Sequence, residues 1–249
     1  MREFLQARIL LSLQDHGAFT NWAFCGGPAL RFLYDLPRYS EDLDFSITPP
    51  GGDARFSTQI ADVVTDLRRE TYEVQAKIRE GKAVASAFVS FPGLLHEFGL
   101  SPHRHESLSV KIEIDMRPPD GAQTATRLIR RFVILNLLHH DKASLLAGKI
   151  HAILTRRYTK GRDLYDLAWY LSDPHWPAPN LEFLGNALRQ TGGAGAWSDR
   201  ADWRALLSQK LQTADWNKAR ADVSPFLERA ADVQLVSPDV ILHLLPPPA

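Results

Sequence analysis

Apolar and polar positions follow different periods in the two halves of the chain. Up to about residue 116, short segments are apolar or alternate apolar with polar residues, as strands do. These segments predict strands over 21–25, 42–47, 83–91 and 108–116. From about 138 to 230, apolar residues recur every three or four positions, which predicts helices.

Helical spacing also occurs among the predicted strands. It predicts helices over 4–15, 29–34 and 55–80. The run Pro118-Pro119-Asp120-Gly121 is a strong break between the halves. The sequence therefore predicts an α+β protein, with a mixed sheet and flanking helices over residues 1–120 and a mostly helical domain over 121–249.

Composition narrows the class of protein. The 249 residues include 29 Lys and Arg against 29 Asp and Glu, so the net charge does not indicate a nucleic-acid partner. The single Cys25 excludes an intramolecular disulfide and a Cys-rich zinc site. Without a run of about 18 apolar residues, we expect no membrane span. The N-terminal segment is typical of an amphipathic helix rather than a signal peptide, which fits a cytoplasmic location.

Acidic side chains are placed at strand spacing in two segments. Asp42 and Asp44, two positions apart on a predicted strand, point to the same side and repel each other unless a cation lies between them. A divalent metal carrying a nucleoside triphosphate is one candidate. Glu113 or Asp115 on strand 108–116 would supply a third carboxylate, and the pattern does not choose between them. The simpler interpretation of such a pair alone is a solvated strand face.

Two further segments carry groups suited to phosphate. Gly26-Gly27 precede a predicted helix, where backbone can approach a ligand closely and free N–H groups attract phosphate. Basic or titratable side chains then gather within 14 residues: Lys149, His151, Arg156, Arg157, Lys160 and Arg162. Such cations can neutralise triphosphate charge. Asp163 and Asp166, three positions apart, share a helix face and are alternatively a cap or ion-pair partners.

In order and spacing, these motifs resemble the AbiEii/AbiGii-type toxin family of the DNA polymerase β-like nucleotidyltransferase superfamily. The matching segments are Gly26-Gly27-Pro28-Ala29-Leu30-Arg31, Ser40-Glu41-Asp42-Leu43-Asp44-Phe45, Lys111-Ile112-Glu113-Ile114, Lys149-Ile150-His151-Ala152-Ile153 and Arg162-Asp163-Leu164-Tyr165-Asp166. Pro28 stands where Thr or Ser is usual, which removes a hydroxyl and a backbone N–H.

The resemblance implies a nucleotidyltransferase-type sheet and a role for each motif. Mg²⁺ or Mn²⁺ would be held by Asp42, Asp44 and Asp115, with Glu113 as the other candidate for the third carboxylate. Lys149 would neutralise phosphate charge, Asp163 would be a further catalytic carboxylate, and Asp166 would orient Lys149 or Arg162. The remaining nucleotide contacts would come from Gly26, Gly27, Arg31 and Ser40.

The resemblance also implies an activity. It indicates a toxin of a toxin–antitoxin or phage-defence pair that transfers a nucleotide from an NTP to an acceptor, with the tRNA 3′ end as the leading acceptor and a separate antitoxin as partner. One alternative keeps the fold and changes the acceptor to an aminoglycoside-like small molecule or a protein hydroxyl. Another is a non-catalytic module that binds a nucleotide or a partner.

Overall fold

The structure is a computed structural model that describes residues 1–192 and 202–245. The chain forms two compact units, and each is described by itself. Unit 1 comprises Met1–Leu33, Ser40–Pro118 and Ala125–His139. Unit 2 comprises Tyr34–Tyr39, Pro119–Thr124 and His140–Ala249.

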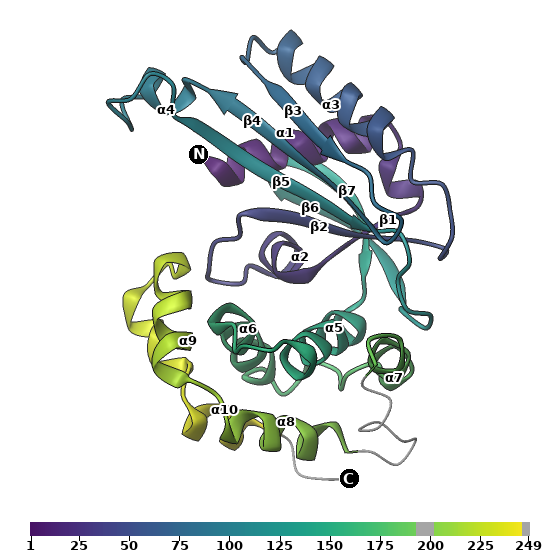
Figure 1. The fold of residues 1–249 in the computed structure, drawn as a ribbon, viewed down its shortest axis with the longest axis vertical. Coiled ribbons are helices and arrows are strands. Elements are labelled where there is room, and N and C mark those ends of the chain that lie inside the picture. Colours follow the sequence, from purple (N-terminus) through teal and green to yellow (C-terminus); the bar gives the residue numbers. More distant parts are fainter. Residues whose placement is uncertain (193–201, 246–249) are drawn as a thin grey trace. The chain divides into compact units, whose positions relative to one another are not determined.

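Unit 1 is built on a seven-stranded mixed sheet with the order β3-β4-β5-β2-β1-β7-β6 (Figure 1). Its strands are β1 (Trp22–Cys25), β2 (Asp42–Ile47), β3 (Gln75–Arg79), β4 (Val84–Pro92), β5 (Ser107–Asp115), β6 (Thr124–Arg131) and β7 (Val133–His140). Its helices are α1 (Arg2–Asp15), α2 (Gly26–Tyr34), α3 (Phe56–Arg69) and α4 (Leu94–Glu97), with a 3₁₀ turn at Ala18–Thr20. β2 is parallel to β5 and antiparallel to β1, and β1 is parallel to β7.

Alternate residues of the central strands form the core of unit 1. Leu43 lies beside Ile112 and Phe45 beside Ile114 in the β2–β5 register, and all four are buried. The ring of Phe45 lies 5.3 Å from that of Trp22. Helices α1 and α3 pack against each other, α1 also against β5 and α3 against β3 and β4. Because side chains alternate along a strand, the residues between these core positions lie on the opposite face of the sheet.

Most of the predicted elements are confirmed. The strands predicted over 21–25, 42–47, 83–91 and 108–116 are β1, β2, β4 and β5, and the first two helices are α1 and α2. The helix predicted over 55–80 is too long: α3 ends at Arg69, Thr71 has a φ of +71°, and β3 follows. All five residues of β3 are exposed, so this edge strand has no buried face that the apolar pattern could reveal.

The division into units differs from the predicted boundary at residue 120. Strands β6 and β7 lie beyond that boundary, yet they complete the sheet of unit 1. β6 is an almost fully exposed edge strand, and its sequence therefore lacks a clear alternation. The neighbouring β7 buries Leu135 and Leu137.

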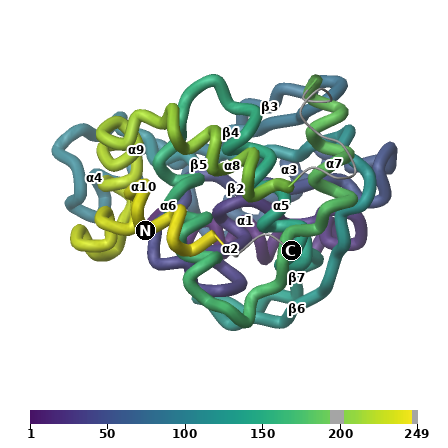
Figure 2. The backbone as a smooth tube through the Cα atoms, turned by 90° about the horizontal axis from the view of Figure 1, so that it is seen from below, coloured from purple at the N-terminus to yellow at the C-terminus, as the bar shows by residue number. Residues whose placement is uncertain are grey.

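Unit 2 is helical, as predicted for most of the second half. Its helices are α5 (Lys142–Thr155), α6 (Gly161–Leu171), α7 (Leu181–Gln190), α8 (Trp203–Gln212), α9 (Trp216–Val223) and α10 (Pro238–Leu244), with 3₁₀ turns at Ser224–Phe226 and Ala230–Leu235. α5 packs against α6, α7 and α8, and α6 packs against α9 and α10 (Figure 2). A Cβ on Gly161 would lie 1.8 Å from the carbonyl oxygen of Ala219, so glycine allows α6 and α9 to touch. Within the described ranges, no helix has the length and apolar character to cross a membrane.

Candidate functional site

The predicted site residues fall into two groups, one in each unit. In unit 1, β2 and β5 carry acidic residues on the face opposite the core. Their parallel register sets Asp42 beside Lys111, Asp44 beside Glu113, and Ser46 beside Asp115. Glu113 is therefore the direct neighbour of the Asp42–Asp44 pair, and Asp115 lies one step farther along the strand.

Lys111 is a charged member of this face that the sequence analysis did not include among the site residues. Its Nζ lies 2.8 Å from Oε1 of Glu113. Burial disfavours the charged ammonium, but the hydrogen bond to Glu113 and the charges of Glu113, Asp42 and Asp44 outweigh it, so the pKa of Lys111 is raised. The alternation of β5 already put Lys111 on the same face as Glu113, which is the signal that could have identified it.

Asp115 has different surroundings from Glu113. Its Oδ1 accepts a hydrogen bond from the backbone N–H of Arg117 at 2.9 Å. Burial nevertheless dominates and raises the pKa of Asp115. The register, which sets Glu113 directly beside Asp44 and Asp115 beside Ser46, favours Glu113 as the third carboxylate.

The glycine motif lies against Asp44. Gly26 begins α2 with a φ of +71°, and a Cβ at this position would lie 2.8 Å from Oδ2 of Asp44. Glycine is therefore required both by the backbone conformation and by the closeness of the carboxylate. Gly27 and Pro28 are buried in the first turn of the helix. Gly26 and Gly27, which were expected to precede the helix, are thus its first two residues.

Arg31 and Ser40 make contacts within unit 1. The guanidinium of Arg31 is buried and donates two hydrogen bonds to Glu3, at 2.9 and 3.1 Å. Contact between Arg31 and a nucleotide would require this ion pair to open. The carbonyl oxygen of Ser40 accepts a hydrogen bond at 3.0 Å from Gln6, which also donates to the carbonyl oxygen of Asp42. Gln6 thereby fixes the backbone that enters β2.

In unit 2, Lys149 is the centre of a buried ionic network. Its Nζ lies 2.9 Å from Oδ1 of Asp163 and 2.7 Å from Oδ2 of Asp166. Burial disfavours its charge, but Asp163 and Asp166 outweigh both burial and the repulsion from Arg38, so the pKa of Lys149 is raised. The pKa of Asp163 is lowered, because the charges of Lys149 and Arg156 outweigh its burial. Direct contact between Lys149 and a phosphate would therefore compete with two carboxylates.

Arg38 completes this network, and the sequence analysis did not identify it. Its Nε and Nη2 donate to the two carboxylate oxygens of Asp166 at 2.5 and 2.6 Å. Arg38 is 3% exposed and Asp166 is 0% exposed. Burial disfavours the guanidinium charge, but Asp166 outweighs it and the pKa of Arg38 is raised. Arg38 lies in a connector without periodicity, so no sequence pattern pointed to it.

The oxygen ligands that a divalent metal prefers are present in unit 1. Mg²⁺ is commonly held by one or two carboxylates together with substrate phosphates, and Asp42 and Asp44 fit that donor set. Glu113 could join them once it is released from Lys111. Across residues 1–192 and 202–245, no three His, Cys, Asp or Glu side chains are grouped so that they could hold a metal ion by themselves.

Comparisons with known proteins identify the family of the chain. The sequence matches the family described as "Nucleotidyl transferase AbiEii toxin, Type IV TA system" over residues 8–238. A comparison with curated protein sequences finds no match.

Two solved structures show the same fold at low sequence identity. MenT4, a nucleotidyltransferase toxin from Mycobacterium tuberculosis H37Rv, has a TM-score of 0.60 and 19% identity, over 96% of this chain and 81% of that one. JHP933 from Helicobacter pylori has a TM-score of 0.51 and 18% identity, over 96% of this chain and 91% of that one.

The family description covers the function at a coarse level. It names a nucleotidyltransferase that is the toxin of a type IV toxin–antitoxin system, which implies an NTP substrate and a cognate antitoxin. With the match spanning most of the sequence, the chain belongs to the AbiEii family of nucleotidyltransferase toxins.

Proposed function

We propose that this enzyme transfers a nucleotide from an NTP to the 3′ end of tRNA in a Mg²⁺-dependent reaction. The observation that carries the proposal is the β2–β5 register, in which Asp44 lies beside Glu113 and Asp42 lies on the same face. Adjacent carboxylates of this kind suit the binding of a metal–triphosphate complex. The tRNA acceptor comes from the family resemblance, as do a cytoplasmic site of action and a role in phage defence.

Each carboxylate on the β2–β5 face has a role in this proposal. Asp42 and Asp44 bind the metal-complexed triphosphate, and bound Mg²⁺ would neutralise charge that develops on the phosphates. Glu113 accepts the proton of the attacking 3′-hydroxyl. The hydroxyl oxygen forms a bond to the α-phosphorus, the bond from that phosphorus to the bridging oxygen breaks, and pyrophosphate leaves with the electron pair. Asp115, which lies one step farther along β5 opposite Ser46, stays the second choice for the role of Glu113.

The experiment is nucleotide transfer by the purified protein. Total tRNA, Mg²⁺ and each α-³²P-labelled NTP are incubated separately with wild type, Asp44→Asn and Asp62→Asn. Asp62 is a carboxylate on helix α3 that pairs with His16, so Asp62→Asn is the matched control. We expect a labelled tRNA band with wild type and the control, and a loss of at least a hundredfold with Asp44→Asn. Full transfer by a folded Asp44→Asn variant contradicts the metal assignment.

The net charge of zero favours a small molecule or a protein over RNA as the acceptor. In that case label appears on a small hydroxyl-bearing molecule or on a protein, and an excess of tRNA does not suppress it. Labelling of no acceptor at all, with the NTP still bound, would support a non-catalytic binding module instead.

A further inference from the structure

Positive charge gathers in unit 2 around the segment that joins α5 to α6. Arg156, Lys160 and Lys210 line one small pocket there, together with Tyr158, Thr159 and the apolar residues Ile153, Leu164, Leu211 and Ala214. The three cations come from the end of α5, the beginning of α6 and the last turn of α8. A concave surface lined by several cations is the type of surface that binds anions.

Two of these cations already have partners. Lys210 donates a hydrogen bond to the carbonyl oxygen of Arg156 at 2.8 Å, which fixes the end of α5. Nε of Arg156 lies 3.2 Å from Oδ2 of Asp163. The Arg156 side chain is still 37% exposed, so the rest of its guanidinium can reach a ligand.

Lys160 differs from its neighbours. Within the part of the chain that the structure describes, its ammonium has no hydrogen bond and no ion pair. Burial lowers the pKa of Lys160, and the positive charges of Arg162, Arg156 and Lys149 lower it further, against the charge of Asp163. A bound anion would relieve this repulsion.

The nearby carboxylates are occupied. Asp163 pairs with Lys149 and Arg156, and Asp166 pairs with Lys149 and Arg38. Asp222 is occupied as well, because its Oδ2 accepts a hydrogen bond at 3.4 Å from the backbone N–H of Arg162 in the first turn of α6. Tyr158, 58% exposed, lies at the same pocket and offers a ring on which a base could stack.

We propose that Lys160 and Arg156 form a phosphate-binding subsite of unit 2 that takes a phosphate group of a nucleotide ligand. The phosphate belongs either to the triphosphate of the NTP or to the backbone of the RNA acceptor. The proposal rests on the proposed function for the identity of the ligand. Lys149, by contrast, is held by the two carboxylates of Asp163 and Asp166.

The test is equilibrium binding by the full-length protein in EDTA, where no transfer occurs. Wild type, Lys160→Met, Lys160→Arg and Lys218→Met are titrated with tripolyphosphate, with each NTP and with a short RNA that has the tRNA 3′ sequence. Lys218 is an exposed lysine of α9, and its replacement is the matched control. Loss of one charge-assisted hydrogen bond predicts about a tenfold weaker affinity for Lys160→Met. Lys160→Arg and Lys218→Met should stay within about twofold of wild type.

Comparison of the three ligands identifies the source of the phosphate. Weaker binding of tripolyphosphate and NTP assigns the subsite to the triphosphate. Weaker binding of RNA alone, with the slope of log Kd against log salt reduced by about one, assigns it to the RNA backbone. Unchanged affinity for all three ligands in Lys160→Met overturns the proposal.

Two further controls keep the result interpretable. If Lys160→Met does not fold by circular dichroism, Lys160→Gln replaces it. Because binding is measured without turnover, a failure of the subsite and a failure of nucleotide transfer are separate results.

Discussion

Arg38 and Asp166 form a doubly hydrogen-bonded ion pair in the interior of unit 2. Replacing Arg38 with Met leaves Asp166 buried with Lys149 as its remaining cationic partner. Removing one partner of a buried pair costs about 3–5 kcal/mol, because the other charge stays out of water. We expect Arg38→Met to lower the free energy of unfolding by about 3 kcal/mol, as measured by urea titration. Lys149 limits the loss to the lower part of this range.

Arg157→Met provides the matched control for this substitution. Arg157 is exposed and lies in the same unit, so its replacement should change the free energy of unfolding by less than about 0.5 kcal/mol. Equal stability of the Arg38→Met and Arg157→Met variants would mean that the buried pair contributes nothing.

At the scale of residues, the sequence predicted which side chains share a face better than it predicted which residues those side chains contact. Alternation correctly placed Lys111, Glu113 and Asp115 on one face of a strand, but only the register with β2 sets Glu113 next to Asp44. Likewise, helical spacing put Asp163 and Asp166 on one face, whereas the pairing of Asp166 with a residue 128 positions away depends on the tertiary fold. Periodicity gives the direction of a side chain and not the residue that it meets.

At the scale of elements, the beginning of α2 lies against strand β2. Gly26→Ala has to hold a φ of +71° and bring a methyl group to 2.8 Å from Oδ2 of Asp44. We expect the free energy of unfolding to fall by about 2 kcal/mol, as strain and steric conflict add. Nucleotide transfer should fall further than the loss of folded protein explains, because Asp44 has to move.

Gly17→Ala separates these two causes. Gly17 has a similar φ of +75°, but a Cβ there meets no atom within 4 Å. Its replacement should lower the unfolding free energy by about 1 kcal/mol through strain alone and leave transfer unchanged. The contact with Asp44 is unimportant if both variants lose the same stability and keep full transfer.

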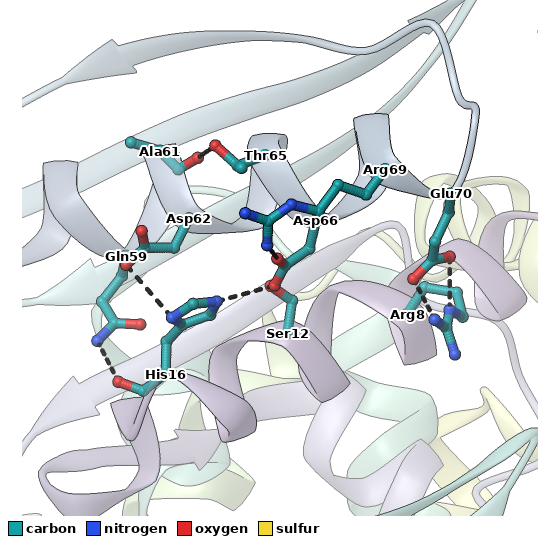
Figure 3. Close-up of polar contacts among 10 residues, drawn as sticks. All are labelled: Arg8, Ser12, His16, Gln59, Ala61, Asp62, Thr65, Asp66, Arg69 and Glu70. Carbon is teal, nitrogen blue, oxygen red and sulfur yellow. Dashed lines mark hydrogen bonds and ion pairs between the residues drawn. The ribbon is translucent and has the colours of Figure 1, made fainter.

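Helices α1 and α3 are joined by a polar cluster around Asp66 (Figure 3). Ser12 donates to Oδ2 of Asp66 at 2.6 Å, and His16 Nε2 lies 2.8 Å from the same oxygen. Burial would raise the pKa of Asp66, but the hydrogen bonds from Ser12 and His16 and the charges of His16 and Arg69 outweigh it, so the pKa is lowered. The ionised carboxylate therefore holds the two helices together.

A lowered folded-state pKa gives a stability contribution that is present above the unfolded pKa of about 4 and is lost as the pH falls through the folded value. Asp66→Asn should therefore lower the free energy of unfolding by about 1 kcal/mol at pH 7, and this difference should shrink as the pH falls below about 4. Urea titrations at several pH values measure it. Asp62→Asn, whose carboxylate lies 3.6 Å from His16, should show a smaller effect. A difference independent of pH would contradict the assignment.

Burial of one strand face separates the strands that the sequence predicted from those that it missed. β2 and β5 each bury one face, so their side chains alternate and both strands were found. The edge strands β3 and β6 are almost wholly exposed, and they are held by backbone hydrogen bonds to a neighbouring strand, which leave no trace in the pattern of side chains.

At the scale of the whole molecule, the chain enters unit 2 at residue 34, returns at 40, enters again at 119, returns at 125 and enters finally at 140. No single cut therefore separates the two units. The predicted boundary at residue 120 would remove β6 and β7 from the sheet. β1 would then lose the strand on one of its two sides.

Because of this topology, fragments of the chain test directly which strands the sheet needs in order to fold. We expect a fragment of residues 1–140 to fold and a fragment of residues 1–120 to stay unfolded, because the shorter one lacks buried Leu135 and Leu137 and the ion pair of Arg131 with Glu3. Trp22 is the single tryptophan of both fragments. In the full chain it is buried, and its Nε1 donates to the carbonyl oxygen of Ala54 at 3.0 Å.

The fluorescence of Trp22 therefore reports the core of unit 1. Its emission should be blue-shifted in fragment 1–140, as for a buried indole, and should match that of unfolded protein in fragment 1–120. Amide dispersion in ¹⁵N-HSQC spectra gives an independent readout. Native-like emission and dispersion in both fragments would show that β6 and β7 are dispensable for the sheet, and the boundary predicted at residue 120 would then describe the folding unit better than the division at 140.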